Sequence, residues 1–577
     1  MRHAVQPNHG KGHDEYMKAC AVLSPLTPRN PAGLAAGIYG ANVAGHDWGR
    51  AALHHGTMNR YLFIGDTMAP SLPIPVTHTE TSHDSPLPAL PPHLTFADIM
   101  HGRFPRVDLQ AFHNPNGGPG LHREAVLRRL LGSSAPATTV IHTISYADQE
   151  MAFIRLLLTD VHLGDAIVCT SEASRPIVRK RIEAAARLLQ TDIAKERADR
   201  LQLPIVPLGV DTEFYTPADP PAKAHARHLL NLPQDKVIIM WMGRLSSQDK
   251  ADLSSLLLAL RDLATEGASV HLVIAGEDRH YYSAILRRMC SALGITNLVS
   301  IVRNLPDGMG PVAYHAADIF AAPTDNLQET FGLTVLEAMA SGLPVVAADW
   351  DGHRDTVVNG ETGFLIPTMW GNCTERIQQL CLLDQVLLQH HVLAETVVVS
   401  QACLTQRLRE LVASQPLRQR MGQAALHRVE TTFCWKQVIS QYEHLWLELE
   451  TVAAAARRDD SAAPAIGIMP YYNWFRHYAS TALTDDDLII AADPQAAYPP
   501  SAAVLDSPEL QPYFDLSLAQ AIIEYCAPEP RSVRTLAQQF SAVTTPSLTM
   551  MILWLCKHGS CRCLRLDAMP EAVSTNQ

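Results

Sequence analysis

The chain has 577 residues, of which 47% are hydrophobic and 18% are charged. This length predicts about three or four domains, and the composition is typical of a globular protein with large cores. The formal net charge of -12 argues against a general nucleic-acid binder, because surfaces that bind phosphate backbones are basic.

The chain begins with a polar stretch, residues 1–16, which is rich in histidine and predicts a flexible tail. No apolar run approaches the length of a membrane span, which needs about 20 residues. The eleven cysteines follow no framework spacing, which indicates reduced thiols. We therefore expect a cytoplasmic protein, and peripheral contact with the inner face of the membrane is the alternative that stays open.

Residues 17–215 alternate short apolar runs with helical patterns and predict a first Rossmann-like domain. Unbroken apolar runs are typical of parallel strands that are covered on both faces. A basic helical segment, residues 175–200, also carries acidic side chains, which favours a solvent-exposed helix over a membrane-binding one. The expected strands are MKACAVLSP, RYLFIG, TTVIHTISY, DAIVCTS and LPIVPLGVD.

Residues 216–450 repeat this pattern and predict a second Rossmann-like domain, whose last helix is expected to cross back to the first. The repetition favours two doubly wound sheets in tandem. Ligands of such sheets bind at the carboxyl ends of the strands, so we expect a site between the two domains. The expected strands are KVIIMWMGR, VHLVIAGED, LVSIVRNL, ADIFAAPT, LPVVAAD and GFLIP, and the expected helices include LSSLLLALRDLA and YYSAILRRMCSALG.

The last part of the chain has a different composition. Residues 451–465 predict a linker, and residues 466–577 predict a small, mostly helical module of three short helices and a strand pair, compatible with a winged helix. From Ser461 onward six Lys and Arg stand against eleven Asp and Glu, the wrong sign for binding phosphates. We therefore expect this module to bind protein or to dimerise, and we expect no nucleic-acid partner.

The sequence predicts no metal site, since no Asp-X-Asp pair has a clear metal context. Cys556, His558, Cys561 and Cys563 lie close together in the sequence. Zinc sites usually show two separated pairs of ligands, and free cysteines are often buried. These side chains are therefore expected to pack in a small core, although the sequence leaves metal binding open.

The stretch ETFGLTVLE carries Glu329 and Glu337 on either side of small and apolar residues. Thr330 is expected to cap a helix that ends at Gly342 and places Glu337 about 10 Å along its axis. The first amides of a helix bind anions, and carboxylates accept hydrogen bonds from paired hydroxyls. One glutamate is then suited to a hexose and the other to a ribose. The alternative is two ordinary carboxylates that flank a helix start.

A second charged group follows the first strand of the second series. Gly243 and Arg244 come directly after KVIIMWM, and Lys250 lies six residues beyond Arg244. Positive charge at a strand end stabilises a departing diphosphate. Taken alone, this pair is more simply interpreted as solvated charges in a loop, so its meaning depends on the rest of the chain.

Together these segments resemble a retaining glycosyltransferase of family 4, which belongs to the glycosyl transferases of group 1. The resemblance covers residues 17–450 and depends on PLGVD, GRLSSQDK, IAGE, PTDNLQETFGLTVLEAMASGLPVVAADWDGHRDTV and NGETGFLIP, in this order. It implies an α/β GT-B fold, with an N-terminal acceptor domain and a C-terminal nucleotide-sugar domain. It also implies transfer of a sugar from a UDP- or GDP-sugar to a polysaccharide, lipid or small-molecule acceptor, with no obligatory cofactor.

The resemblance also implies the roles of individual residues. Arg244 and Lys250 would neutralise the diphosphate, Glu329 would contact the sugar hydroxyls, and His142 matches a histidine that faces the donor sugar. These four are the implied catalytic residues. The implied donor-binding residues are Gly243, Gly276, Asn304, Leu305, Thr330, Phe331, Gly332, Leu333 and Glu337.

Some positions depart from the family pattern or are less specific. Lys250 lies one residue later than in many relatives, and Asp355 stands where relatives often have Glu. His142 on its own is equally well interpreted as a satisfied residue at a strand end. Gly37 and Gly40 are expected to form a glycine-rich loop near the phosphates and the acceptor, although glycine-rich turns are common.

A retaining reaction without an evident protein nucleophile implies front-face substitution, in which the leaving phosphate accepts the proton of the acceptor. The protein then supplies positioning and electrostatic stabilisation. Two other functions stay open from the sequence. One is a nucleotide-sugar epimerase on the same fold, and the other is a non-catalytic scaffold or regulator that acts through the C-terminal module.

Overall fold

The structure is a computed structural model, and its chain divides into two compact units. The larger unit covers residues 1–94 and 105–466, and the smaller covers 95–104 and 467–577. The expected tail, residues 1–16, and Gly37 lie outside the described residues. The described residues are 18–23, 40–56, 60–65, 93–95, 108–115, 118–146, 149–159, 161–248, 250–278, 281–306, 308–373, 377, 386–455, 472–473, 476–492 and 514–567.

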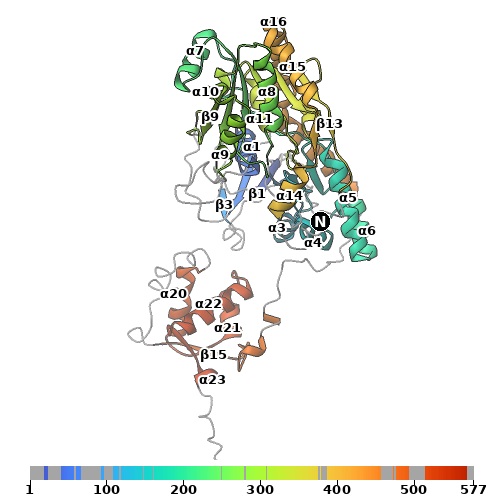
Figure 1. The fold of residues 1–577 in the computed structure, drawn as a ribbon. Helices are drawn as coiled ribbons and strands as arrows, with labels where there is room; N and C mark the ends of the chain where they lie inside the picture. The colour runs from blue at the N-terminus through green and yellow to red at the C-terminus, as the bar shows by residue number, and fades with distance from the viewer. Residues whose placement is uncertain are drawn as a thin grey trace, which may run out of the picture. The chain divides into compact units, whose positions relative to one another are not determined.

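The first half of the larger unit is built on a six-stranded sheet with the order β3-β2-β1-β4-β5-β6, of which β1 and β3 are labelled in Figure 1. β1 pairs in parallel with β2 and β4, and the pairs β4–β5 and β5–β6 are also parallel. This order is typical of dinucleotide-binding sheets. Successive strands are added on one side of β1 up to β3 and then on its other side from β4, so the strand order reverses between β1 and β4. The strands are β1 Lys18–Leu23, β2 Arg60–Gly65, β3 His93–Thr95, β4 Asp108–Asn114, β5 Ala137–Ile141 and β6 Ala166–Cys169.

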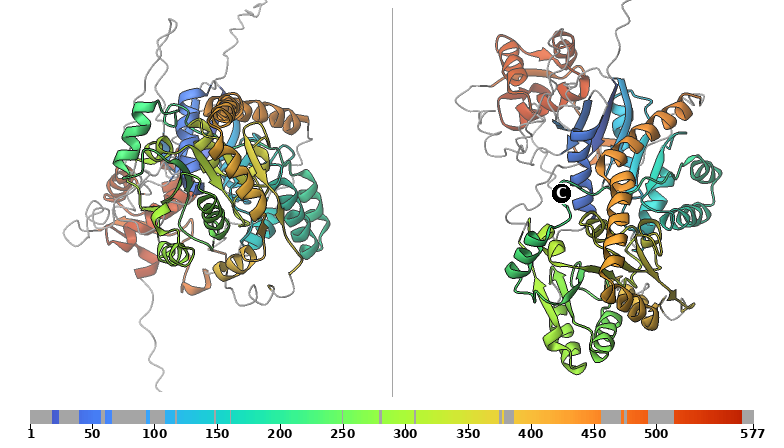
Figure 2. Two further views of the ribbon diagram at one scale, coloured as in Figure 1. Left: turned by 45° about the horizontal axis from the view of Figure 1, so that its top comes forward. Right: turned by 90° about the horizontal axis from the view of Figure 1, so that it is seen from above.

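The long helix α17, Trp435–Ala455, follows the second half in sequence but packs on the first, against α1 and β4 (Figure 2). Trp48 of α1 contacts the rings of Tyr442 and Trp446 of α17, and Trp446 Nε1 donates to Thr138 Oγ1 at 3.1 Å. This aromatic core joins the end of the larger unit to its beginning. The other helices of this half are α1 Gly40–His55, α3 His122–Leu130, α4 Gln149–Leu158, α5 Ser174–Leu189 and α6 Asp192–Arg200.

The second half is built on another six-stranded sheet, with the order β12-β11-β10-β7-β8-β9. All neighbouring strands are parallel. Counted from its own first strand, this sheet has the same strand order as the first sheet. Its strand order reverses between β7 and β10. The strands are β7 Val237–Met242, β8 Val270–Gly276, β9 Val299–Arg303, β10 Ile319–Ala322, β11 Val345–Ala348 and β12 Gly363–Ile366.

Helices cover both faces of the second sheet, and a short β13–β14 pair, Thr368–Met369 with Val398–Val399, lies beyond β12. The helices alternate with the strands along the chain, as expected for a doubly wound fold. They are α7 Pro220–Leu229, α8 Ser254–Thr265, α9 Tyr282–Ala292, α10 Gly310–Ala316, α11 Leu333–Ala340, α12 His353–Thr356, α14 Val386–Ala394, α15 Gln401–Ala413 and α16 Gln415–Arg428, with the π-helical turn η2 Val429–Phe433.

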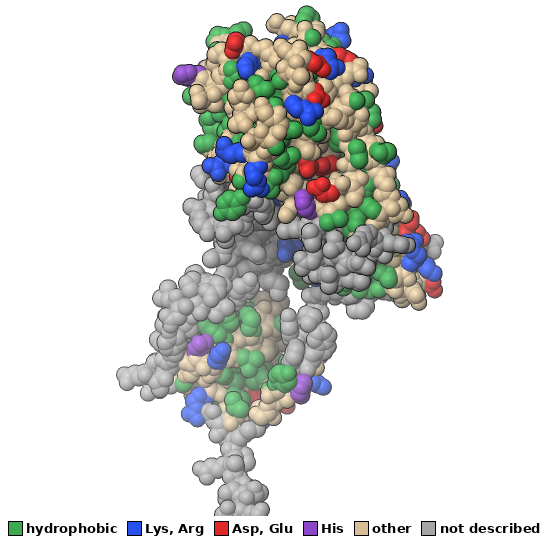
Figure 3. Space-filling view, in the orientation of Figure 1, with side chains coloured by type: hydrophobic (Ala, Val, Ile, Leu, Met, Phe, Trp, Pro, Cys, Tyr) green, Lys and Arg blue, Asp and Glu red, His purple; other side chains and the backbone are tan. Residues whose placement is uncertain are grey.

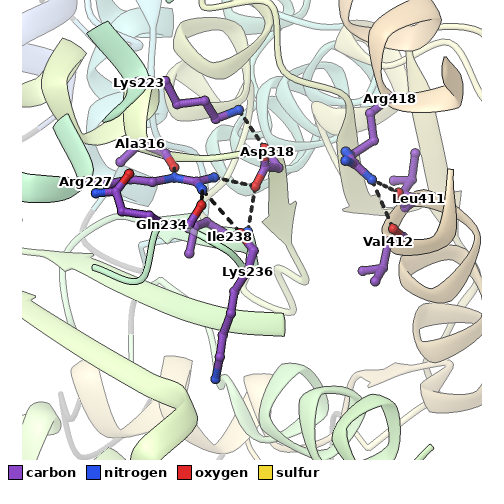
Figure 4. A network of polar contacts seen from close by, with 10 residues as sticks. All are labelled: Lys223, Arg227, Gln234, Lys236, Ile238, Ala316, Asp318, Leu411, Val412 and Arg418. Atoms are coloured by element: carbon purple, nitrogen blue, oxygen red, sulfur yellow. Dashed lines mark hydrogen bonds and ion pairs between the residues drawn. The ribbon is translucent and has the colours of Figure 1, made fainter. Parts of the chain in front are cut away.

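An ion-pair network attaches α7 to the amino-terminal ends of the central strands β7 and β10 (Figure 4). Asp318 accepts from Lys223 Nζ and Arg227 Nη2, both at 2.6 Å, and from the Ile238 amide at 2.7 Å. Arg227 also donates to the carbonyl of Ala316. Arg418 closes the end of α15 by donating to two backbone carbonyls of its last turn. Charge-assisted bonds of this kind are the stronger ones, so the scaffold around the second sheet is rigid.

The predicted fold class, two tandem Rossmann-like domains with a small helical module, is confirmed, although several strand predictions differ from the structure. β4, with the sequence DLQAFHN, was not predicted, because polar residues interrupt its apolar pattern. LPIVPLGVD was predicted as a strand but forms only isolated bridges, such as Cys169 with Ile205. Pro204 and Pro207 lack the amide hydrogens that a continuous ladder needs.

The smaller unit has a three-stranded antiparallel sheet with the order β16-β15-β17. β17 pairs with β15, which was not predicted, so CRCLRL is one strand followed by a helical turn and is not the predicted strand pair. Arg565 donates to Asp487 with two nitrogens and closes this fold. Its elements are β15 Leu488–Ala491, α20 Leu516–Cys526, β16 Arg531–Ser532, α21 Val533–Gln539, α22 Thr545–Lys557, β17 Cys561–Cys563 and α23 Leu564–Asp567.

Cys561 and Cys563 are buried in the core of the smaller unit, as the sequence predicted, and Cys556 packs against this core. Burial raises the pKa of the Cys561 thiol to about 12, so this thiol is protonated at neutral pH. In the part of the chain that the structure describes, no group of three or more His, Cys, Asp or Glu could hold a metal ion. The described part also contains no helix that is both long and apolar enough to cross a bilayer.

Candidate active site

The predicted cations and carboxylate lie together between β7 and β10, where the strand order of the second sheet reverses. Gly243 and Arg244 follow β7, Lys250 lies further along the same loop, and Glu329 ends the loop after β10. β7 and β10 are neighbours in the sheet, and their carboxyl ends lie at the same edge. A crevice at such a reversal point is where open α/β sheets bind ligands.

Glu329 and Lys250 form an ion pair, with Nζ and Oε2 separated by 2.8 Å. Burial alone would raise the pKa of Glu329, but the charge and hydrogen bond of Lys250, together with the charge of Arg244, outweigh burial and lower it. Glu329 is therefore an ionised carboxylate at neutral pH. An ionised, largely buried carboxylate beside two cations is suited to accept hydrogen bonds from hydroxyl groups.

The helix after Glu329 begins two residues later than predicted. Thr330 was predicted to cap it, but α11 starts at Leu333, and Gly332 precedes it in the left-handed region at φ 93°. A Cβ on Gly332 would lie 2.9 Å from His353 Cδ2, so only glycine fits there. The chain turns at Gly332, and Thr330 is consequently free to bond elsewhere. Phe331 is buried in the core, while the first amides of α11 have no partner within the helix.

Thr330 instead connects the second half to His142 in the first half. Thr330 Oγ1 donates to the backbone carbonyl of His142 at 2.6 Å. The His142 ring bonds through Nε2 to the carbonyl of Pro115 at 2.5 Å, and burial lowers the pKa of His142. The ring is therefore neutral and donates to Pro115. The structure brings His142 next to the Glu329 segment, and its contact with a sugar stays a prediction.

The predicted donor-binding residues Gly276, Asn304 and Leu305 lie at the ends of β8 and β9. The Asn304 amide donates to the Gly276 carbonyl at 2.8 Å, and Asn304 Oδ1 accepts from the Asp278 amide. A Cβ on Gly276 would lie 1.7 Å from the carbonyl oxygen of Gly243, so the two strand ends meet at glycines. Leu305 packs partly buried against the core. These residues line the same edge of the sheet as Arg244.

Glu337 lies on α11, where Tyr314 donates its hydroxyl to Glu337 Oε2 at 2.7 Å. Tyr314 is fully buried, and burial, followed by the charge of Glu337, raises its pKa far above the ordinary value. This bond fixes one carboxylate oxygen of Glu337. Gly40, predicted to belong to a glycine-rich loop, is the first residue of α1.

Several residues at this edge were not predicted from the sequence. His353 contributes to the field around Glu329, and Asp351 has a pKa well above its ordinary value because of burial and the nearby charge of Glu329. Tyr146 donates its hydroxyl to Gln328 Oε1 at 2.6 Å. The resemblance could have drawn attention to DGHRD, which carries Asp351 and His353, but no local signal marks Tyr146 or Gln328.

Asp355, where family relatives often have Glu, also connects the two halves. Its Oδ2 accepts from the Glu172 amide at 2.7 Å. Together with the bonds Thr330–His142 and Tyr146–Gln328, this bond joins residues 328–355 to the first half. The site therefore has walls from both sheets.

Residues 223–393 match the family model described as Glycosyl transferases group 1. The chain is 31% identical over 224 residues to the D-inositol 3-phosphate glycosyltransferase of Stackebrandtia nassauensis, covering 35% of this chain and 49% of that protein. It is 27% identical over 321 residues to the protein of the same name from Nocardia farcinica, covering 50% and 68%. In the first of these comparisons the chain spans about half the length of the curated relative.

The fold is similar to the crystal structure of Anabaena Alr3699/HepE in complex with UDP. The TM-score is 0.50 at 16% sequence identity, and the match covers 75% of this chain and 100% of the other. At this identity the similarity concerns the fold. Arg244, Lys250 and Glu329 all lie within the segment that the family model matches.

Proposed function

We propose that the protein is a retaining glycosyltransferase, because its residues 223–393 match the family model described as Glycosyl transferases group 1. Its donor is a nucleotide-diphosphate sugar, with UDP or GDP as the nucleotide. Its acceptor is a polysaccharide, a lipid or a small molecule that binds against the first half, and the reaction takes place in the cytoplasm.

The observation that supports this proposal best is the cluster of Arg244, Lys250 and Glu329 at the reversal point of the second sheet. Two cations suit a diphosphate, and the carboxylate beside them suits sugar hydroxyls. A transferase needs an acceptor wall close to the donor sugar, and the bonds from Thr330 to His142 and from Tyr146 to Gln328 bring the first half next to this cluster.

In the proposed step, the bond between the sugar anomeric carbon and the β-phosphate oxygen breaks while the acceptor oxygen bonds to the same face of that carbon. The proton of the acceptor moves to the departing phosphate oxygen. Arg244 and Lys250 stabilise the negative charge that develops on the diphosphate. Glu329 holds the sugar hydroxyls and so fixes the reacting carbon relative to the acceptor.

The smaller unit is proposed to contact a protein surface. On α22 the exposed face includes Met550, 39% exposed, and Leu553, 50% exposed, one turn apart. A helix that reads nucleic acid would carry basic side chains on such a face. This part of the proposal is separate from the transfer reaction and does not affect the test below.

Substitution of Glu329→Gln tests the proposed function. The variant keeps the size of the side chain but loses the charge that accepts hydrogen bonds from hydroxyls and pairs with Lys250. We expect turnover of UDP-glucose or GDP-mannose, followed by release of the nucleotide, to fall about 100-fold. The matched control is Glu448→Gln, which changes an exposed glutamate of α17 and should leave turnover unchanged.

Equal turnover by Glu329→Gln and the unaltered protein would contradict the proposed role of the carboxylate. Interconversion of sugar epimers without transfer to an acceptor or to water would instead favour the epimerase.

A further inference from the structure

Gln328, the residue before Glu329, has a side-chain amide whose oxygen and nitrogen differ in their hydrogen bonding. Its Oε1 accepts the Tyr146 hydroxyl at 2.6 Å. Its Nε2 is shielded from solvent and has no hydrogen-bond partner among the described residues. A buried amide donor without a partner costs roughly 1–3 kcal/mol, so a ligand that supplies an acceptor there gains affinity.

The backbone at Gln328 is held in place by its neighbours. The Gln328 amide donates to Asn326 Oδ1 at 2.9 Å, and Asn326 Nδ2 donates to the Gln248 carbonyl at 2.8 Å. The indole of Trp350 donates to the Asn326 carbonyl at 2.9 Å. The turn before Glu329 is thus fixed on both sides, and only the side-chain torsions of Gln328 can vary.

Tyr146 is held as firmly on the other side of the site. Arg181 of α5 donates to the carbonyls of Ile144 and Tyr146, and its guanidinium lies over the Phe153 ring at 5.3 Å. The Tyr146 ring meets the ring of His390 of α14 edge to face, with centroids 4.8 Å apart. A tyrosine fixed at its backbone, its ring and its hydroxyl is well suited to orient the group that accepts its proton.

We propose that Gln328 is a donor-sugar specificity residue, whose Nε2 donates to a hydroxyl of the sugar, and that Tyr146 is the positioning residue that aims it. This inference rests on the proposed function, because it takes Glu329 to be the neighbouring sugar contact. With Oε1 occupied by Tyr146, the amide can present only its N–H groups to a ligand. The site then selects a sugar with a hydroxyl at that position.

The same contact couples the two halves of the larger unit. Tyr146 follows β5 of the first sheet, and Gln328 follows β10 of the second. The bond joins residues 182 apart in the sequence, next to the bond between Thr330 and the His142 carbonyl. The orientation of the donor sugar therefore depends on the first half, whereas Arg244 and Lys250, the cations proposed to bind the diphosphate, lie in the second half.

This difference gives a test by calorimetry with two kinds of ligand. UDP, GDP and ADP are titrated first, and the nucleotide that binds is then compared with its glucose conjugate. Gln328→Met preserves the length of the side chain and removes both hydrogen-bonding ends. We expect it to weaken binding of the glucose conjugate about five- to tenfold and to change binding of the free nucleotide less than about twofold.

Tyr146→Phe removes only the hydroxyl and should weaken the glucose conjugate about threefold. The double variant should be no weaker than Gln328→Met, because both changes act through one contact. Control variants are Tyr472→Phe and Gln423→Leu, which change exposed side chains far from Gln328 in the sequence.

Two results would overturn the inference: Gln328→Met binds the glucose conjugate as tightly as the unaltered protein, or the losses in the double variant add. Equal weakening of nucleotide and conjugate would also overturn it, since that is what a merely structural role predicts. If the unaltered protein binds none of the three nucleotides, the proposed function itself fails and this inference fails with it.

Discussion

Glu329 shows how a single carboxylate keeps its charge in a largely buried position. Its burial would favour the neutral form, yet the charges of Lys250 and Arg244 lower its pKa. Asp351 lies in the same field, where burial and the charges of Glu329 and Asp355 outweigh the opposing charge of Arg354 and raise its pKa. Two carboxylates in one site thus have opposite protonation tendencies, which is a common property of functional sites.

Glu124 in the first half provides a pH test of buried charge. It lies in the first turn of α3, is fully buried, and accepts from Asn114 Nδ2 at 2.7 Å. Burial, helped by the charge of Asp165, raises the pKa of Glu124 to about 7, against 4.5 for the unperturbed group. Between pH 4.5 and pH 7 the folded protein binds more protons than the unfolded chain. The contribution of Glu124 to the free energy of unfolding is therefore complete below pH 4.5 and is lost as the pH rises through 7.

The variant Glu124→Gln stays neutral at every pH and lacks this dependence. The free energy of unfolding of the unaltered protein, minus that of the variant, should decrease by about 3 kcal/mol between pH 4.5 and pH 8. Urea unfolding at both pH values measures this difference. Glu448→Gln serves as the control, and a difference that is the same at both pH values would show that Glu124 is ionised throughout.

At the scale of elements, the start of α11 depends on one glycine. Gly332 has φ 93°, and a Cβ there would lie 2.9 Å from His353 Cδ2. Gly332→Ala should therefore cost the left-handed strain of about 1–2 kcal/mol and also displace His353 from the neighbourhood of Glu329. We expect lower thermal stability together with a loss of donor binding of tenfold or more.

Gly267→Ala is a matched control for this substitution. Gly267 has a similar φ of 86°, but a Cβ on it would meet nothing within 4 Å. It should show the backbone strain in the melting temperature without a loss of donor binding. Similar donor binding by both variants would mean that the position of His353 does not matter to the site.

The sequence predicted the second sheet better than the first, and the reason is physical. All six strands of the second sheet are short apolar runs, as buried parallel strands usually are. β4 carries Gln110 and His113 in buried positions, where Gln110 donates to Glu450 and His113 bonds to Thr138, and such partners are distant in sequence. A pattern of single residues cannot show a contact of that kind.

The residues of the candidate site were also predictable where they follow apolar strands, but their contacts with the first half were not. Arg244, Lys250 and Glu329 follow strand ends, and the structure brings Lys250 and Glu329 together. The cap predicted for Thr330 was wrong because the left-handed Gly332 moves the helix start, and the hydroxyl bonds to a carbonyl 188 residues away. Contacts between the two halves depend on how the sheets face each other, which local sequence does not determine.

At the scale of the whole molecule, charge and unit organisation agree with a small-molecule enzyme. On the visible face of the described residues, acidic and basic side chains are interspersed and no large basic patch is present (Figure 3). α17 follows the second sheet in the sequence but packs on the first sheet, and it thereby joins the two halves of the larger unit. The smaller unit has its own core, and the residues of the proposed donor site all belong to the larger unit.

The central claim is that the larger unit binds a nucleoside diphosphate at the reversal point of its second sheet. The most direct measurement is calorimetric titration of the full chain with UDP, GDP and ADP in parallel. At about a hundred times its dissociation constant, the preferred nucleotide should also stabilise the fold by about 2.7 kcal/mol. Arg244→Ala should weaken binding at least tenfold, because it removes a charged donor to phosphate, whereas Arg288→Ala on the exposed face of α9 should not. Binding of none of the three nucleotides, or equal binding by Arg244→Ala and the unaltered protein, would contradict the account.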